Sequence, residues 1–196
     1  PLETIKLIVG LANPGPQYQD TRHNAGAWFV TELARQQGCT LSSESRFYGE
    51  TARIQYQGSD LRLLIPSTFM NRSGQAIAAL ANFYKIEPES ILIAHDELDI
   101  PAGSARYKKG GGHGGHNGLR DSVAQLGNNS NFHRLRIGIG HPGHASQVTN
   151  YVLGKPSADD RTSIDHCIDE ALRTLPDAVN GDWAKAMNQL HSYKQG

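Results

Sequence analysis

The stretch Lys108–Gly118 constrains the fold of this chain most, because six of the nine residues in Gly110–Gly118 are glycine. Glycine reaches positive φ angles without a Cβ clash, and a run this dense weakens any helix or strand that contains it. A helical spacing follows, with Leu119, Val123 and Leu126. A loop that carries two lysines and enters a helix is typical of an anion site, because free N–H groups and the helix dipole favour negative charge. The alternative is a flexible linker, but linkers seldom place two histidines and an asparagine between glycines.

Apolar runs and helical spacings alternate along the rest of the chain. They predict strands at residues 5–9, 47–56, 61–65, 91–94, 103–107 and 132–139. They predict helices that begin near Ala25, at a cap on Asn71 or Ser73, after the glycine stretch, after Ser157 and at Trp183, with Pro176 interrupting the fourth. A chain of 196 residues with this alternation fits one domain, residues 1–196. The expected fold is an α/β three-layer sandwich, in which helices flank a twisted, mixed and largely parallel sheet.

Charge is unevenly distributed in a chain whose formal net charge is zero. Residues 103–158 contain seven lysines and arginines but a single acid, Asp121. Net neutrality argues against a general polyanion binder, whereas the basic third favours a local phosphate-binding face. A solvated charged surface with no ligand is the alternative.

The sequence predicts a cytoplasmic protein. No apolar run approaches the roughly 20 residues that a membrane helix needs. The apolar stretch at residues 5–9 is too short for the apolar region of a signal peptide, and its pattern is that of a strand. Cys39 and Cys167 are isolated, which fits a reducing compartment.

Unusual polar residues follow several predicted strands. Asn13 lies just past the first strand, Phe69-Met70-Asn71 past the third, Asp96 ends the fourth, and His116-Asn117 follow the fifth. Ligands of open α/β sheets bind at the carboxyl ends of the strands. If most of these strands are parallel, we expect the polar groups to meet in one crevice.

Histidine is the side chain whose ordinary pKa lies closest to neutral, so the nine histidines of the chain are the first candidates for a general base. His95 adjoins Asp96, but neighbours on a strand point to opposite faces, so Asp96 needs another partner. We predict that His23 pairs with Asp96, which would hold the imidazole in one tautomer. Asn13, Asn71 and Asn117 are candidates for gripping an amide or an oxyanion. The alternatives are that His23 is only a cap and that the asparagines serve turns.

Several familiar motifs are absent or incomplete. Gly10–Gly15 has the spacing of a P-loop, but Pro16 stands where its lysine is needed. Gly110–Gly115 matches a dinucleotide fingerprint without its acid about 20 residues later. The nucleophile elbow G-x-S-x-G is missing. Two His-x-x-His pairs, at residues 113–116 and 141–144, have no acid or cysteine close by, so neither a metal nor another cofactor is expected.

Six blocks of the chain together resemble the signatures of bacterial peptidyl-tRNA hydrolases. The blocks are Ile8–Gly15 (IVGLANPG), Thr21–Gly26 (TRHNAG), Phe69–Gly74 (FMNRSG), His95–Asp99 (HDELD), Gly110–Gly118 and Phe132–Gly140 (FHRLRIGIG). They follow that family's order and cover residues 5 to about 155. Many members carry glycine where this chain has Ala12, a departure that adds one methyl group and leaves Asn13 in place.

The resemblance implies a metal-independent hydrolase that uses water to cleave the ester between a peptide, or an N-blocked amino acid, and the tRNA 3′ end. It implies that His23 is the general base and Asp96 its orienting acid. Contacts with the peptide and acceptor end are assigned to Asn13, Tyr18, Phe69, Met70, Asn71, His116 and Asn117. Discrimination against a free amino group is assigned to Asn13, and the tRNA 5′-phosphate to Lys108 and Arg136. The partner is peptidyl-tRNA released from ribosomes, and a monomer is the family's expectation.

Three other functions compete with this interpretation. A non-catalytic RNA-binding protein on the same fold is the main alternative, although His23, Asp96 and the three asparagines are all present. A nucleotide-dependent enzyme would use the glycine loop, and a general esterase would cleave small esters without RNA.

Overall fold

The computed structural model describes residues 2–194, which form a seven-stranded sheet in the order β2-β3-β4-β1-β5-β7-β6. The strands are β1 (Leu7–Gly10), β2 (Ser42–Glu44), β3 (Gly49–Tyr56), β4 (Ser59–Pro66), β5 (Ile91–Glu97), β6 (Ala105–Lys109) and β7 (His133–Gly138). The four central strands β4, β1, β5 and β7 run parallel, while β2, β3 and β6 add antiparallel edges. The expected mixed sheet is confirmed, and its parallel strands all end on the same side.

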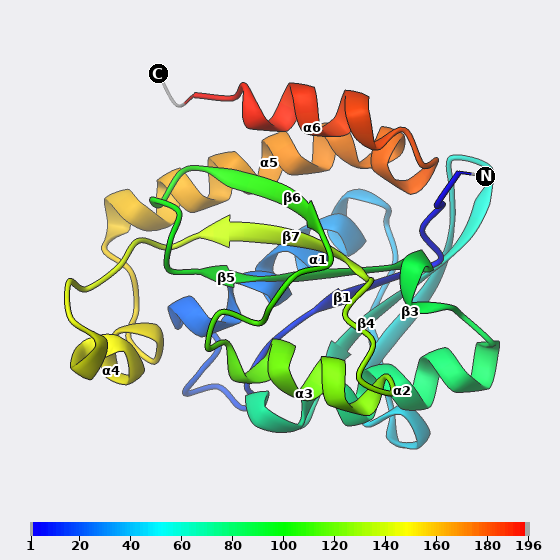
Figure 1. Ribbon diagram of the computed structural model, residues 1–196, viewed down its shortest axis with the longest axis horizontal. Helices are drawn as coiled ribbons and strands as arrows, with labels where there is room; N and C mark the ends of the chain where they lie inside the picture. Colours follow the sequence, from blue (N-terminus) through cyan, green and yellow to red (C-terminus); the bar gives the residue numbers. More distant parts are fainter. Residues whose placement is uncertain (1, 195–196) are drawn as a thin grey trace.

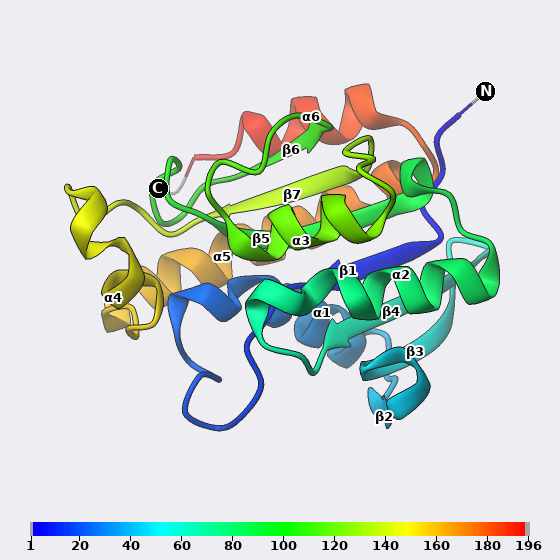
Figure 2. The same cartoon turned by 60° about the horizontal axis from the view of Figure 1, so that its bottom comes forward.

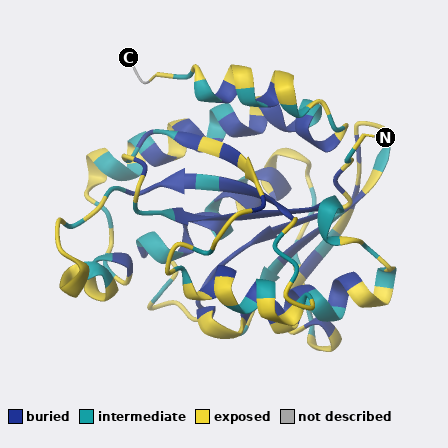
Figure 3. Cartoon of the chain, in the orientation of Figure 1, coloured by how far each residue is buried: buried dark blue, intermediate teal, exposed yellow. Residues whose placement is uncertain are grey.

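Helices cover both faces of this sheet, as Figures 1 and 2 show. The helices are α1 (Ala25–Gln36), α2 (Ser73–Tyr84), α3 (Asn117–Gln125), α4 (Val148–Val152), α5 (Ala158–Val179) and α6 (Trp183–His191). Helices α1 and α5 pack on one face, α2 and α3 on the other, and α6 lies against α5 and β6. Side chains alternate between two cores, with Ile8 in one and Leu7 and Val9 in the other. Figure 3 shows the buried sheet between helices whose outer faces are exposed.

Two glycines bring functional segments close to the ends of the strands. A Cβ on Gly26, in the first turn of α1, would lie 2.2 Å from the backbone oxygen of Ala94 in β5. A Cβ on Gly118, at the start of α3, would lie 2.6 Å from the sulfur of Met70. Only glycine permits such close approach, so these residues seat α1 on β5 and α3 on the segment after β4.

Three details differ from the sequence-based expectations. The short polar strand β2 and the short helix α4 (Val148–Val152) carry too little apolar periodicity to be predicted. Pro176 does not interrupt α5, which continues to Val179. Burial of Leu175, Ala178 and Val179 in the core outweighs the hydrogen bond that a proline removes.

The predicted cap on Asn71 or Ser73 is also wrong. Arg72 occupies the N-cap position of α2 without a side-chain cap, and the 3-10 turn Met70–Arg72 (η3) leads into the helix. The Ser73 hydroxyl instead donates to the backbone oxygen of Met70. By contrast, Ser157 caps α5 as expected, accepting from the backbone N–H of Asp160.

Among the helices of residues 2–194, none combines the length and the apolar composition that crossing a membrane requires.

Candidate active site

A cavity of about 580 Å³ lies where the parallel strands end. Its lining comes from the segments after β1 and β4, the end of β5, the glycine loop, and the segment from His141 to Leu153 that contains α4. Six of the predicted polar residues line it: Asn13, His23, Asn71, Asp96, His116 and Asn117. The expected convergence of these groups is therefore confirmed.

His23 and Asp96 pair at the floor of this cavity. The Nδ1 atom of His23 lies 3.0 and 2.9 Å from the two carboxylate oxygens of Asp96. The 3-10 turn Arg22–Asn24 (η1) presents His23, and the end of β5 presents Asp96, whose side chain is only 2% exposed. Since Nδ1–H donates to the carboxylate, the Nε2 atom of His23 keeps its lone pair and bonds to no described residue.

For His23 and for Asp96, burial shifts the pKa in one direction, and the charges of the neighbouring groups shift it in the other. Burial by itself disfavours the protonated ring, but the charge and hydrogen bond of Asp96 outweigh it and raise the pKa of His23. Burial by itself would raise the pKa of Asp96, yet the neighbouring rings of His23 and His116 hold that pKa well below its usual range. Asp96 is therefore an ionised carboxylate that accepts a hydrogen bond from His23.

A second histidine contacts the same carboxylate. The Nε2 atom of His116 lies 2.8 Å from Oδ1 of Asp96. Its Nδ1 atom accepts the backbone N–H groups of Gly118 and Leu119, at 3.1 and 3.3 Å. His116 is thus the N-cap of α3, which corrects the expectation that this helix start offers free N–H groups to an anion.

Asn13 is held rigidly beside the pair. Its Oδ1 atom accepts the backbone N–H of Met70 at 2.7 Å, and Asn24 forms two hydrogen bonds with its backbone. These contacts fix the orientation of the Asn13 side-chain amide. Its NH₂ group donates to none of the described residues. Asn24 positions the Asn13 backbone, and it carries no sequence signal of its own beyond its place in the Thr21–Gly26 block.

The other predicted contact residues lie around the rim. Asn71 and Asn117 are exposed, and the Asn117 side chain accepts from Arg120 at 3.3 Å. Phe69 is 58% exposed and meets the Tyr18 ring edge-on at a centroid distance of 6.4 Å, although Tyr18 does not line the cavity. Met70 is buried beneath the rim.

The predicted phosphate-binding pair lies outside the cavity, on β6 and β7. Lys108 faces Arg134 across the two strands, and Arg136 lies two positions farther along β7. Lys108 is exposed, whereas Arg136 is bound to Glu97 at 2.9 Å. The two cations therefore share one face of the sheet, but one of them already has an acidic partner.

Arg134 is a further residue whose role the sequence does not reveal. It is 2% exposed, and its guanidinium donates to the backbone oxygens of Gly111 and Gly112. These hydrogen bonds anchor the glycine loop, residues 110–118, to β7. In the sequence it is only one of several positive charges.

The cluster of His23, Asp96 and His116 has the spacing of a metal site, with its ligand atoms within 4.8 Å of one another. A metal would need the lone pair of His116 Nε2. Because Nδ1 of that ring already accepts two backbone N–H groups, the proton sits on Nε2 and points at Asp96. The cluster therefore does not fit a metal.

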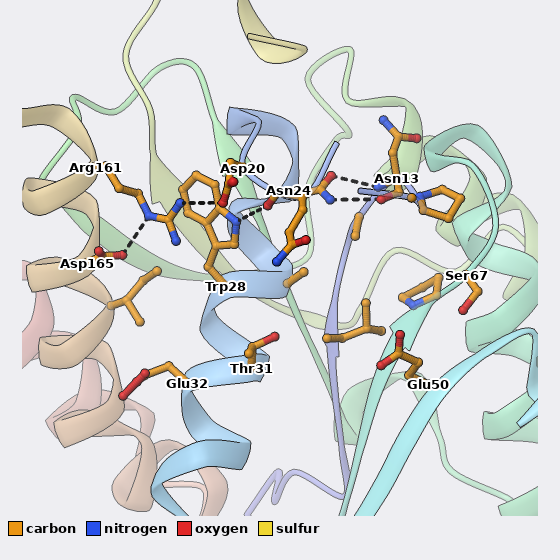
Figure 4. Close-up of a pocket in the computed structure, with 18 of the residues that line it drawn as sticks. Asn13, Asp20, Asn24, Trp28, Thr31, Glu32, Glu50, Ser67, Arg161 and Asp165 are labelled. Atoms are coloured by element: carbon orange, nitrogen blue, oxygen red, sulfur yellow. Dashed lines mark hydrogen bonds and ion pairs between the residues drawn. The ribbon is translucent and has the colours of Figure 1, made fainter. Parts of the chain in front are cut away.

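A larger cavity of about 730 Å³ lies on the other side of Asn13, between α1, α5 and the end of β4. Its charged lining consists of Arg161 and five acids, Asp20, Glu32, Glu50, Asp165 and Asp169. Figure 4 shows Arg161 bound between Asp20 and Asp165 and stacked on Trp28. This acidic cavity contains no histidine and would repel RNA phosphates, so it is a poorer candidate.

Comparisons with known proteins agree with the sequence resemblance. The family model described as peptidyl-tRNA hydrolase matches residues 7–196. Peptidyl-tRNA hydrolases of Chromohalobacter salexigens and Shewanella sediminis are 61% and 62% identical, over 98% of this chain and 99% and 100% of theirs. The crystal structure of peptidyl-tRNA hydrolase from Acinetobacter baumannii is 52% identical and has a TM-score of 0.95, covering 99% of this chain and 98% of that one.

Proposed function

Because this chain belongs to the peptidyl-tRNA hydrolase family and hydrolyses peptidyl-tRNA, we propose that His23 is the general base of the reaction. The observation that carries the proposal is the hydrogen-bonded pair of His23 and Asp96 at the floor of the cavity. Nε2 of His23 accepts a proton from a water molecule while the oxygen of that water attacks the carbonyl carbon of the ester. A positioned general base typically contributes about 10²–10⁴-fold to a rate.

Asp96 serves this base in two ways. Its carboxylate fixes the Nδ1–H tautomer of His23 and stabilises the imidazolium that forms when water is deprotonated. The imidazolium then returns the proton to the ribose oxygen as the ester bond breaks, which restores the neutral base. The acid itself keeps its charge throughout.

Asn13 gives a physical reason for selecting N-blocked substrates. Since the backbone N–H of Met70 occupies its oxygen, the side chain offers only donors to a ligand. A donor suits the carbonyl oxygen of an acylated amino group and opposes the ammonium of a free aminoacyl ester. In the same proposal, the exposed amides of Asn71 and Asn117 bind the peptide or the developing oxyanion.

The RNA binds along the basic strands next to the cavity. Lys108 and Arg136 take the 5′-phosphate, with Arg136 exchanging Glu97 for the phosphate. Phe69 and Tyr18 supply ring surface for the acceptor end or the peptide. We also propose that the protein acts as a monomer, and that it does so in the cytoplasm, where peptidyl-tRNA is released.

The decisive experiment compares N-acetyl-aminoacyl-tRNA with its unblocked counterpart as substrates. We expect the enzyme to cleave only the blocked form, to lose that activity in His23→Ala, and to retain it in EDTA once the tRNA is folded. Binding of the tRNA without cleavage would favour the alternative, a non-catalytic RNA-binding protein. Full activity in His23→Ala would refute the assignment of the base.

A further inference from the structure

Two backbone N–H groups decide which nitrogen of His116 carries the proton. Gly118 and Leu119 both donate to Nδ1, which must therefore present its lone pair. The ring proton is then on Nε2, and it is donated to Oδ1 of Asp96 at 2.8 Å. Both nitrogens of the ring are used inside the protein, so neither is available to a substrate.

From this arrangement we infer that His116 is a positioning residue, which fixes the Asp96 carboxylate and weakens its hold on His23. The inference rests on the proposed role of His23 as the base. It replaces the sequence-based interpretation of His116 as a substrate contact. His116 acts through Asp96 and exchanges no proton with the substrate.

The shared carboxylate explains how one histidine acts on the other. Oδ1 of Asp96 accepts from His116 and also lies 3.0 Å from Nδ1 of His23. A carboxylate that accepts an additional N–H group exerts a smaller pull on its other partner. The positive end of α3 strengthens this second donor, because two of its N–H groups polarise the His116 ring.

Hydrogen bonds at both nitrogens and contacts with two other rings hold the ring of His116 in this orientation. The centroid of the His116 ring lies 4.9 Å from that of His23 and 5.2 Å from that of His95. Asp96 from β5 contacts His23 directly and raises its pKa, and the ring of His116 packs against the His23 ring. The other titratable residues that line the same cavity are His95, Glu97, Asp99, His113 and His141.

This geometry also ties the base to the glycine loop. His116 ends that loop and begins α3, while the guanidinium of Arg134 holds the loop at Gly111 and Gly112. A displacement of the loop therefore moves the donor on Asp96. In this way the position of the loop sets how strongly Asp96 holds His23.

The test separates the capping role of His116 from its contact with Asp96. His116→Asn keeps a side-chain acceptor for the N-terminus of α3, but its amide is too short to reach the carboxylate. Ser122→Ala is the matched control, because the Ser122 hydroxyl bonds to the backbone oxygen of Gly118 in the same helix and does not touch Asp96. For each enzyme, kcat and KM are measured with N-acetyl-aminoacyl-tRNA from pH 5 to 9, together with the melting temperature.

We expect His116→Asn to lower kcat about tenfold at little cost in KM, and to move the acid limb of kcat/KM upward by roughly half a pH unit or more. Ser122→Ala should lower the melting temperature and leave the acid limb of the kcat/KM profile at its wild-type pH. The inference is overturned if His116→Asn matches the wild type, if it changes only KM, or if Ser122→Ala moves the limb equally.

A measurement on the wild-type protein keeps the inference testable even if His116→Asn does not fold. ¹⁵N NMR of the histidine rings at pH 7 should find the proton of His116 on Nε2, and a proton on Nδ1 would refute the inference. Loss of activity in His23→Ala combined with wild-type behaviour of His116→Asn would reject this inference alone and leave the proposed base intact.

Discussion

Nδ1 of His23 lies 2.9 Å from Oδ2 of Asp96, although 73 positions separate the two residues in the chain. The contact exists because α1 packs on β5 through Gly26, which brings the turn before α1 against the end of that strand. One nitrogen of the ring is thereby bound to a buried carboxylate, and the other is left free for a water molecule.

His23→Ala should lower kcat with N-acetyl-aminoacyl-tRNA by about 10²–10⁴-fold, because it removes the proposed general base. KM should change little, since the ring contributes to the transition state rather than to substrate binding. Steady-state kinetics with circular dichroism as a folding control check this outcome. A loss confined to KM would mean that His23 only binds the substrate.

The pH profile should reveal the charge of Asp96. Since Asp96 raises the pKa of His23, wild-type kcat/KM should fall as the pH drops through a value above the ordinary 6.5. In Asp96→Asn the charge is gone and burial still disfavours the imidazolium, so the acid limb should move to lower pH while kcat falls about 10²–10⁴-fold. This shift is opposite in sign to the one expected for His116→Asn. A limb that stays in place in Asp96→Asn would contradict the pairing.

Much of this site follows from the sequence, because its key residues sit at positions with a general meaning. Asn13 and Asp96 follow or end predicted strands, and parallel strands bring their carboxyl ends together. The pairing of His23 with Asp96 is predictable because the neighbouring His95 points to the opposite face of the strand. The His95 ring indeed donates to the backbone oxygen of Asp96 and not to its side chain.

The remaining parts depend on three-dimensional contacts that leave no periodic trace. The cap by His116, the clamp on Asn13 and the anchoring of the loop by Arg134 each join a side chain to a particular backbone group. Such bonds depend on loop conformation and not on spacing in the sequence. The course of α5 through Pro176 escapes prediction for a related reason, since tertiary burial overrides a local preference.

Because the His95 ring is buried, the free energy of unfolding should depend on pH in the acid range. Burial and the neighbouring His116 lower the pKa of His95 to about 3 from the ordinary 6.5. Between these values the unfolded chain binds a proton that the folded protein does not, so stability should fall as the pH drops through this window. Each titrating group contributes at most about 1.4 kcal/mol per pH unit to that slope. His95→Asn should reduce the slope measured by urea unfolding at pH 4 to 6, and an equal slope would show that His95 is protonated in the folded state.

The phosphate pair should respond to salt and to its acidic neighbour. Lys108→Ala and Arg136→Ala should raise KM for the tRNA substrate and flatten its dependence on salt, because each removes one phosphate contact. Glu97→Gln is the informative counterpart, since it frees the Arg136 guanidinium from its 2.9 Å ion pair and should lower KM. KM measured between 50 and 300 mM KCl checks both signs. Unchanged salt slopes in the alanine variants would remove these residues from the phosphate site.

Gly118→Ala should damage the active site through packing alone. The new methyl group would meet the sulfur of Met70 at 2.6 Å and the side chain of Leu11 at 2.9 Å, so that the start of α3 or these two buried side chains must shift. Because His116 caps that helix, the displacement should weaken its bond to Asp96 and lower kcat together with the melting temperature. Gly112→Ala is the matched control, since a Cβ at that position would have nothing within 4 Å and its φ is not in the left-handed region. We expect this control to retain wild-type kcat and stability, and equal damage in both variants would mean that glycine content, not the close contact with Met70, is what the loop requires.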